Sequence, residues 1–239
     1  MSLLDDLKNE TDKIVKGAWD RRDGEVVPEN DDVGLGNKAV DLVATFLYAD
    51  LVDSTQLAIA RQEVAAEVCK AYLMGTTKII RASGGEIRSF DGDRVMGVFH
   101  SGAKNTAAAE AGLKINYFFS QILKSAFEDF YGSLFPSKFQ LRQTVGIDTG
   151  KVMVVRTGIR NNNDLIWVGR APNIAAKLSG IREEGYSTYI SKRVFGSLLD
   201  GSKFGGNPPR LMWEYRTWAA GTEINTGELY RSNWWWRPD

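Results

Sequence analysis

Residues 44–50, ATFLYAD, form an apolar run that ends in a carboxylate, Asp50. The run belongs to a longer β-branched segment, residues 40–52, which predicts a buried strand. Residues 53–80 then follow a helical pattern that a pair of glycines, Gly84 and Gly85, brings to an end. We therefore expect a strand followed by a crossover helix.

A hairpin is expected after this helix. Residues 86–90 and 94–99 are short strand candidates on either side of Asp91-Gly92, a dipeptide that favours tight turns because both residues tolerate positive φ. Residues 103–131 predict a second long helix. Residues 139–157 predict two strands, with a turn at Asp148-Thr149-Gly150.

The predicted order is therefore β-α-β-β-α-β, the ferredoxin-like arrangement of the α+β class. Both helices then cover one face of an antiparallel sheet, and the first and third strands lie side by side. Antiparallel neighbours bring the end of one strand to the start of the other, so Asp50 and Asp93 should meet. The alternative is that Asp93 only serves the turn and Asp50 only caps the next helix.

Paired carboxylates are suited to Mg²⁺ or Mn²⁺, since these hard cations prefer oxygen ligands and leave room for phosphate oxygens. Two such ions can clamp an in-line displacement at phosphorus. Residues 51–55 lead into a helix whose free amides, at Ser54 and Thr55, could hold a triphosphate. We expect Asp53 to cap that helix and not to bind a ligand.

The rest of the chain predicts an α/β extension and an N-terminal appendage. Its expected strands are residues 165–168, 186–190, 211–218 and 228–231, and its expected helices are residues 172–181 and 191–199. Residues 1–38 read as a helix and linker, and residues 39–239 as the main domain. Trp234, Trp235 and Trp236 predict an apolar clasp or a partner contact.

Composition excludes several classes of function. The 239 residues carry 30 basic and 30 acidic side chains, so no charge excess indicates binding to nucleic acid or membrane. One cysteine, Cys69, and one histidine, His100, rule out an intrachain disulfide and zinc sites built from several thiolates or imidazoles. We expect a cytoplasmic protein, because no signal peptide or membrane-length apolar run is present.

Two further motifs concern phosphate. Residues 146–151, GIDTGK, lack one spacer of a P-loop, which excludes that type of site. Asn173 and Lys177 project from one face of a helix that Pro172 is suited to begin. They could orient a ribose and meet phosphate charge, or they could be an ordinary solvated pair.

Three blocks in series resemble the class III adenylate and guanylate cyclases: residues 44–50, residues 84–93 (GGEIRSFDGD), and residues 145–150 (VGIDTG) through 169–178 (GRAPNIAAKL). The resemblance implies that Asp50 and Asp93 bind two Mn²⁺ or Mg²⁺ ions, with help from the Leu51 carbonyl. The ribose 3′-hydroxyl then attacks the α-phosphate, and pyrophosphate leaves a 3′,5′-cyclic nucleotide.

The resemblance also implies a homodimer with shared active sites. One chain supplies the metal-binding aspartates, and the other supplies Asn173 and Lys177. Lys177 stands where the family has an arginine, so it keeps the charge but loses the bidentate fork. Arg170 or Arg216 could provide the missing contact.

The residues that select a purine in that family are absent. Ser89 stands where the adenine-selecting lysine is usual, and Ile166 stands where the selecting aspartate is usual. Tyr48, on the strand face of Asp50, has a hydroxyl that both donates and accepts. This pattern resembles the pyrimidine cyclases of Pycsar anti-phage systems.

That likeness implies a lyase that cyclises UTP, or less readily CTP, into a second messenger for a separately encoded effector in antiviral defence. The alternatives are a purine cyclase with unusual base contacts and an inactive cyclase-like domain that senses nucleotides.

Overall fold

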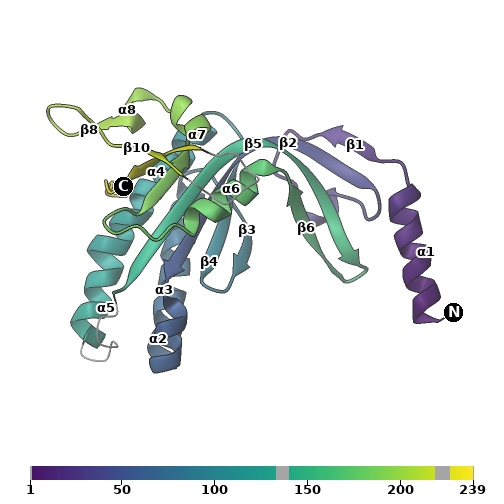
Figure 1. Cartoon of the computed structure of the whole chain (residues 1–239), viewed down its shortest axis with the longest axis horizontal. Coiled ribbons are helices and arrows are strands. Elements are labelled where there is room, and N and C mark those ends of the chain that lie inside the picture. The colour runs from purple at the N-terminus through teal and green to yellow at the C-terminus, as the bar shows by residue number, and fades with distance from the viewer. Residues whose placement is uncertain (1, 133–139, 219–226, 239) are drawn as a thin grey trace. The chain divides into compact units, whose positions relative to one another are not determined.

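The computed structural model describes residues 2–132, 140–218 and 227–238 (Figure 1). By contacts the chain divides into two compact units: unit 1 is Met1–Val43 with Gly150–Arg170, and unit 2 is Ala44–Thr149 with Ala171–Asp239. The predicted boundary between residues 38 and 39 stays a prediction. Among the described helices, none combines the length and the apolarity that a membrane crossing requires.

The sheet of unit 2 has the predicted ferredoxin-like order. Its core strands are β2 (Lys38–Val52), β3 (Glu86–Asp91), β4 (Arg94–Phe99) and β5 (Arg142–Ile159). Side by side they run β5-β2-β4-β3, so the first strand lies between the fourth and the third. β2 and β4 pair antiparallel, as expected, with Asp50 opposite Arg94. The α+β prediction is therefore confirmed.

The helices of the core are α2 (Ser54–Ala60), α3 (Gln62–Ala82), α4 (Lys104–Tyr117) and α5 (Lys124–Tyr131), with a π-helical stretch η2 (Phe118–Leu123) between the last two. α3 and α4 pack against each other and against β4 (Figure 1). Alternate residues of β2 face them, and these residues are Leu47, Ala49 and Leu51. The other face of β2 carries Tyr48 and Asp50, which leaves it available for chemistry.

The C-terminal extension continues the same sheet. Its elements are α6 (Arg170–Ser179), β7 (Thr188–Ser191), α7 (Lys192–Gly196), α8 (Asp200–Lys203), β10 (Glu214–Thr217) and β11 (Glu228–Ser232), with a small separate pair, β8 (Phe204–Gly205) and β9 (Arg210–Leu211). β7 runs parallel to β5, and β11 and β10 follow antiparallel. The strand predicted at residues 211–218 is thus two short strands in different sheets.

Two of the three tryptophans near the C-terminus form the predicted apolar clasp, whereas Trp235 is 47% exposed. Trp234 and Trp236 pack on the core of unit 2. Asn116 of α4 donates to the Trp234 carbonyl at 3.0 Å, and the Trp236 amide donates to the Leu113 carbonyl at 3.2 Å. These bonds tie the end of the chain to α4.

The turn predicted at Asp148-Thr149-Gly150 is wrong. β5 continues through these residues, and its hairpin partner β6 (Asn162–Val168) begins only after Ile159. Asp148 is fully buried, and the Thr149 hydroxyl donates to the Ala44 carbonyl of β2 at 3.2 Å. Thr149 stays in a strand here because the neighbouring strand accepts its hydroxyl. Phe139, the predicted start of the strand, lies outside the described residues.

The predicted helix at residues 53–80 is interrupted. Arg61 has an extended backbone, with φ of −151°, between α2 and α3. Asp53 occupies the cap position of α2, but its side chain makes no capping hydrogen bond. Its φ of 60° is left-handed, and its carboxylate accepts from the Arg142 guanidinium at 3.2 Å. The ion pair with Arg142 therefore replaces the predicted cap.

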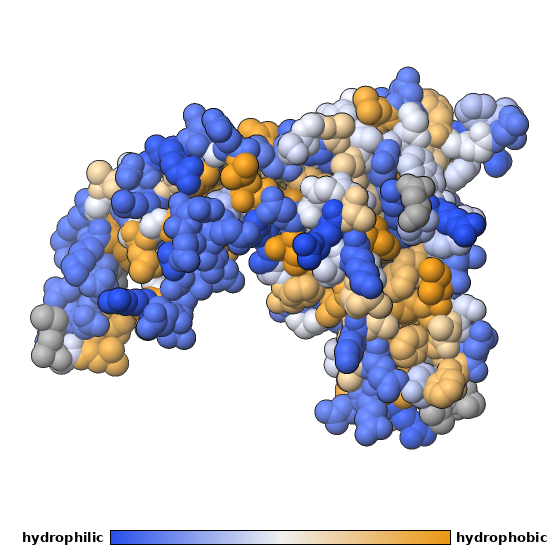
Figure 2. All heavy atoms as spheres, turned by 180° about the vertical axis from the view of Figure 1, so that it is seen from behind, coloured by the Kyte–Doolittle hydropathy of each residue, from blue (hydrophilic) through white to orange (hydrophobic). Residues whose placement is uncertain are grey.

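Unit 1 contains α1 (Leu3–Lys16), β1 (Asp20–Asp23), the short 3-10 helix η1 (Asn30–Asp32) and the β5–β6 hairpin. β1 pairs parallel with the first residues of β2, so the predicted linker includes a strand. α1 has no buried residue. Its apolar side chains are all exposed, and they are Leu3, Leu4, Leu7, Ile14 and Val15. Figure 2 shows hydrophobic patches among hydrophilic ones on this unit.

Gly146 allows α6 to lie directly against β5. A Cβ at this position would stand 2.2 Å from both the Ala175 carbonyl oxygen and the Ser179 amide nitrogen, which are backbone atoms of α6. Neither atom can move without shifting the helix. The side chains of α6, including Asn173 and Lys177, are thus positioned by a strand residue that has no side chain.

We predict that Gly146→Ala lowers the free energy of unfolding by about 3 kcal/mol, because overpacking forces backbone shifts. Urea denaturation measures this change. Gly196→Ala is the control, since Gly196 lies exposed at the end of α7 with nothing within 4 Å of an added Cβ. It should change stability by less than about 1 kcal/mol. Equal stabilities of the two variants would contradict the close packing of α6 on β5.

Candidate active site

Asp50 and Asp93 come together at neighbouring strand ends. Asp50 pairs in register with Arg94, the first residue of β4, so Asp93 directly precedes its partner. The two carboxylates are close enough that the charge of Asp93 raises the pKa of Asp50. The sequence pattern alone predicts this meeting, and the register of β2 and β4 produces it.

Burial is the main cause that raises the pKa of Asp50 above its usual value, and Asp93 adds to it. A hydrogen bond from Arg182 acts in the opposite direction, since the guanidinium Nη2 donates to Asp50 Oδ2 at 2.8 Å. Arg182 follows α6 and is far from Asp50 in sequence. The environment of Asp50 thus disfavours a lone negative charge and favours a bound cation.

Asp93 has an oxygen that suits a metal ion. Its Oδ2 is buried and has no hydrogen-bond partner among the described residues. Such an atom carries a desolvation cost unless something binds it. The described residues contain no cluster of three or more His, Cys, Asp or Glu side chains. Two carboxylates fit the mode in which Mg²⁺ binds one or two carboxylates together with substrate phosphates.

The segment after Asp50 bends sharply away from the strand. Leu51 is buried, Ser54 is half-buried and Thr55 is exposed at the first turn of α2. The left-handed backbone of Asp53 makes this bend, which an aspartate tolerates better than most residues. The roles of Leu51, Ser54 and Thr55 toward metal and phosphate stay predictions.

Tyr48 and Ser89 lie in one row across the sheet. Both pair with Met96 of β4, Tyr48 from β2 and Ser89 from β3. The Arg94 guanidinium lies over the Tyr48 ring, 5.5 Å from its centre. Burial raises the pKa of Tyr48. The row therefore presents a phenol and a small hydroxyl beside Asp50.

The side chains predicted for the other half of the site lie on α6. Asn173 and Lys177 are both exposed there, on one face of the helix, and Arg170 is its half-buried first residue. Arg216 is exposed on β10, 4.0 Å from a carboxylate oxygen of Glu183.

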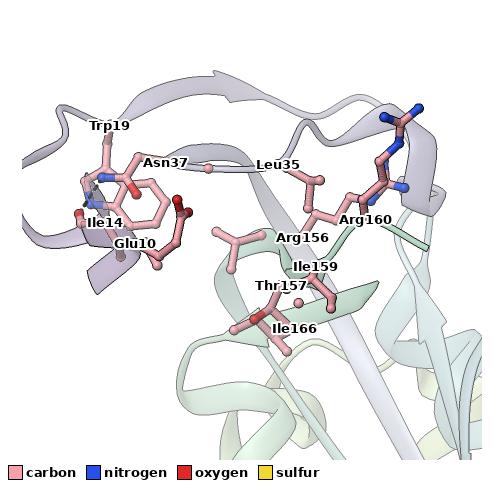
Figure 3. Close-up of a pocket in the computed structure, with 13 residues that line it drawn as sticks. Glu10, Ile14, Trp19, Leu35, Asn37, Arg156, Thr157, Ile159, Arg160 and Ile166 are labelled. Atoms are coloured by element: carbon pink, nitrogen blue, oxygen red, sulfur yellow. Dashed lines mark hydrogen bonds between the residues drawn. The ribbon is translucent and has the colours of Figure 1, made fainter. Parts of the chain in front are cut away.

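Ile166 belongs to unit 1, where it lines a cavity of about 500 Å³ (Figure 3). Ile14, Trp19 and Asn37 lie on one side of this cavity, and Ile159 and Ile166 of the β5–β6 hairpin lie on the other. Ile166 is 43% exposed. Its proposed part in base selection stays a prediction.

Sequence reasoning missed two arginines of unit 2. Arg182 reaches Asp50, and Arg94 reaches both the Tyr48 ring and the Asp91 carboxylate, the latter at 2.7 Å. Arg94 had a signal, because it directly follows Asp93 at the hairpin. Arg182 had none, since it lies outside the three blocks that carry the family pattern.

Comparison with known proteins gives full-length relatives. The chain is 40% identical over 241 residues to the uridylate cyclase of Rhodovulum sp. (strain MB263), covering 100% of this chain and 99% of that protein. It is 39% identical over 241 residues to the uridylate cyclase of Xanthomonas perforans, covering 100% of both. No protein-family model matches the chain.

Solved structures show the same fold at lower identity. The adenylyl cyclase CyaB from P. aeruginosa superposes with a TM-score of 0.63 at 22% identity, covering 81% of this chain and 95% of that one. This match confirms the class III nucleotidyl cyclase fold that the three sequence blocks predict. Because the relatives match over their whole length at about 40% identity, the chain belongs to the uridylate cyclase family.

Proposed function

We propose that this protein converts UTP into 3′,5′-cyclic UMP and pyrophosphate. The observation that carries the proposal is the full-length identity of about 40% to proteins named uridylate cyclase. The convergence of Asp50 and Asp93 supports it, because a lyase acting on a triphosphate needs groups that hold cations. The missing purine-selecting residues, replaced by Ser89 and Ile166, agree with a pyrimidine substrate.

Asp50, Asp93 and the Leu51 carbonyl would hold two divalent ions, Mn²⁺ or Mg²⁺. When bound, such ions stabilise charge on the attacking and leaving oxygens of an in-line displacement. The unpartnered Asp93 Oδ2 and the half-buried Asp50 supply negative charge where cations are needed. Ser54 and Thr55 begin α2 only a few residues after Asp50, and their backbone amides would bind the triphosphate.

The active form is proposed to be a homodimer with two shared sites. α6 presents Asn173 and Lys177 on an exposed face, where a second copy can meet them. Asn173 would orient the ribose, and Lys177, with Arg170 or Arg216, would balance charge on the phosphates. The resemblance to Pycsar pyrimidine cyclases supports a product that a separately encoded effector reads during phage infection.

Tyr48 is proposed to contact the uracil base. Its half-buried ring lies on the sheet face of Asp50, and Arg94 covers that ring at 5.5 Å. Its phenolic hydroxyl can donate to a uracil carbonyl or accept from the ring N–H. Ser89, in the same row, leaves the space that a long lysine would fill in a purine enzyme.

Purified protein incubated with Mn²⁺ and each of the four ribonucleoside triphosphates should give cyclic UMP as the main product, detected by mass spectrometry. Asp93→Asn should lower the rate more than about 100-fold, because it removes charge from the metal site. The control Asp129→Asn changes an acid of α5 and should keep full activity. If no triphosphate gave a cyclic product, the proposed cyclase activity would be refuted. If only ATP or GTP were cyclised, the proposed preference for a pyrimidine would be refuted.

Removing the Tyr48 hydroxyl tests the base contact. Tyr48→Phe should lower kcat/KM for UTP about tenfold, the usual loss for one hydrogen bond. Tyr131→Phe on α5 also removes a bonded hydroxyl, one that donates to Glu67 at 2.6 Å, and should change kcat/KM less than about twofold. Steady-state kinetics with UTP measures both. An unchanged Tyr48→Phe enzyme would exclude a role of this hydroxyl in uracil binding.

Mixing two inactive variants tests the shared site. Asp93→Asn and Lys177→Ala chains should each be inactive alone, and a co-expressed mixture should recover about a quarter of wild-type activity, since half of the dimers then hold one complete site. Heterodimers are counted by purification through two different tags. Inactive heterodimers would show that both sets of residues act within one chain.

A further inference from the structure

Arg182 is held in place from two sides. Its Nη1 donates to the carbonyl oxygens of Ser179, at 2.7 Å, and Ile181, at 3.3 Å. Its Nη2 donates to Asp50 Oδ2 at 2.8 Å. The backbone at the end of α6 therefore fixes one edge of the guanidinium, and the other edge is aimed at Asp50.

Asp50 needs a positive neighbour. Its side chain is only 14% exposed, and Asp93 adds a second negative charge close by. Two partly buried carboxylates repel each other unless a cation balances them. Arg182 is the basic residue that forms an ion pair with Asp50 among the described residues. It places a positive charge directly against Asp50 Oδ2.

We propose that Arg182 is the internal counter-ion of the metal site, which a divalent ion must displace from Asp50 in order to bind. This inference rests on the proposed function, in which Asp50 and Asp93 hold the ions. Arg182 then sets the concentration of free divalent ion at which the site fills. It also keeps the two carboxylates together while no ion is bound.

If Arg182 instead positions Asp50 for the metal, the change in Mn²⁺ affinity on its removal has the opposite sign. If the guanidinium only aimed Asp50 at the metal, its removal would disorder a ligand and weaken metal binding. If it competes with the metal, its removal leaves the two carboxylates with the charge of Arg94 as a weaker balance and strengthens metal binding. The sign of the change in Mn²⁺ affinity therefore separates a counter-ion from a positioning residue.

A matched control is the ion pair of Arg142 with Asp53, which lies three residues after Asp50. Arg142 pairs with Asp53 at 3.2 Å, and its side chain is 36% exposed, the same fraction as that of Arg182. Arg142→Gln breaks an ion pair of the same type close to the site without touching Asp50. Any effect of lost charge on general stability or on the local field appears in this variant too.

The experiment measures the Kd for Mn²⁺ by electron paramagnetic resonance on the full-length protein without nucleotide. Arg182→Gln should bind Mn²⁺ about fivefold more tightly than wild type, the size expected for a partly exposed ion pair. Arg182→Lys should lie close to wild type, and Arg142→Gln should stay within about twofold. The rise in Tm that saturating Mn²⁺ causes should likewise be larger for Arg182→Gln.

Unchanged or weaker Mn²⁺ binding by Arg182→Gln would overturn the counter-ion assignment. So would tighter binding of equal size in Arg142→Gln, because the effect would then not be specific to Asp50. If Asp93→Asn bound Mn²⁺ as tightly as the wild type does, the proposed metal site itself would be overturned, together with this inference. The Tm of Arg182→Gln without added metal, compared with that of the wild type, shows that the variant is folded.

Discussion

The antiparallel register between β2 and β4 is the constraint on which the site depends. Asp50 stands opposite Arg94, and a slip by one residue would turn Asp50 towards the helices and separate it from Asp93. The register is fixed because Leu47, Ala49 and Leu51 must face α3 and α4 in the core. Hydrophobic burial on one face of the strand thus determines where the charges fall on the other.

This placement brings two carboxylates close together in partly buried positions. Asp93 keeps a buried oxygen without a partner among the described residues, and burial raises the pKa of Asp50. An arginine anchored on two backbone carbonyls meets one of these charges. Buried, closely spaced carboxylates would lower the stability of an ordinary protein surface. At a proposed phosphoryl-transfer site they favour the binding of divalent ions.

The strand register positions Asp50 and Asp93. Close backbone packing positions the residues of α6, which form the second half of the proposed site. Gly146 lets α6 touch β5, so the direction in which Asn173 and Lys177 project follows from a missing side chain. The proposed base selection depends on a small side chain: Ser89 pairs with Met96 at the position where the family resemblance implies an adenine-selecting lysine. Tyr48, on the far side of Met96, is the large polar group that remains.

The sequence by itself determined the order of the core, the existence of the hairpin and the meeting of Asp50 with Asp93, because alternation and turn chemistry are local. The turn itself is Gly92-Asp93, one residue later than predicted, because Asp91 still pairs with Arg94 in the strand ladder and only Gly92 has a positive φ. Tertiary structure alone decided that β5 runs through Asp148 and Thr149, since a carbonyl of β2 accepts the hydroxyl that would otherwise favour a turn. It alone decided the break at Arg61, an ordinary helix former. It also joined Arg182 to Asp50 across 132 positions, and no local pattern records a contact that only the folded chain creates.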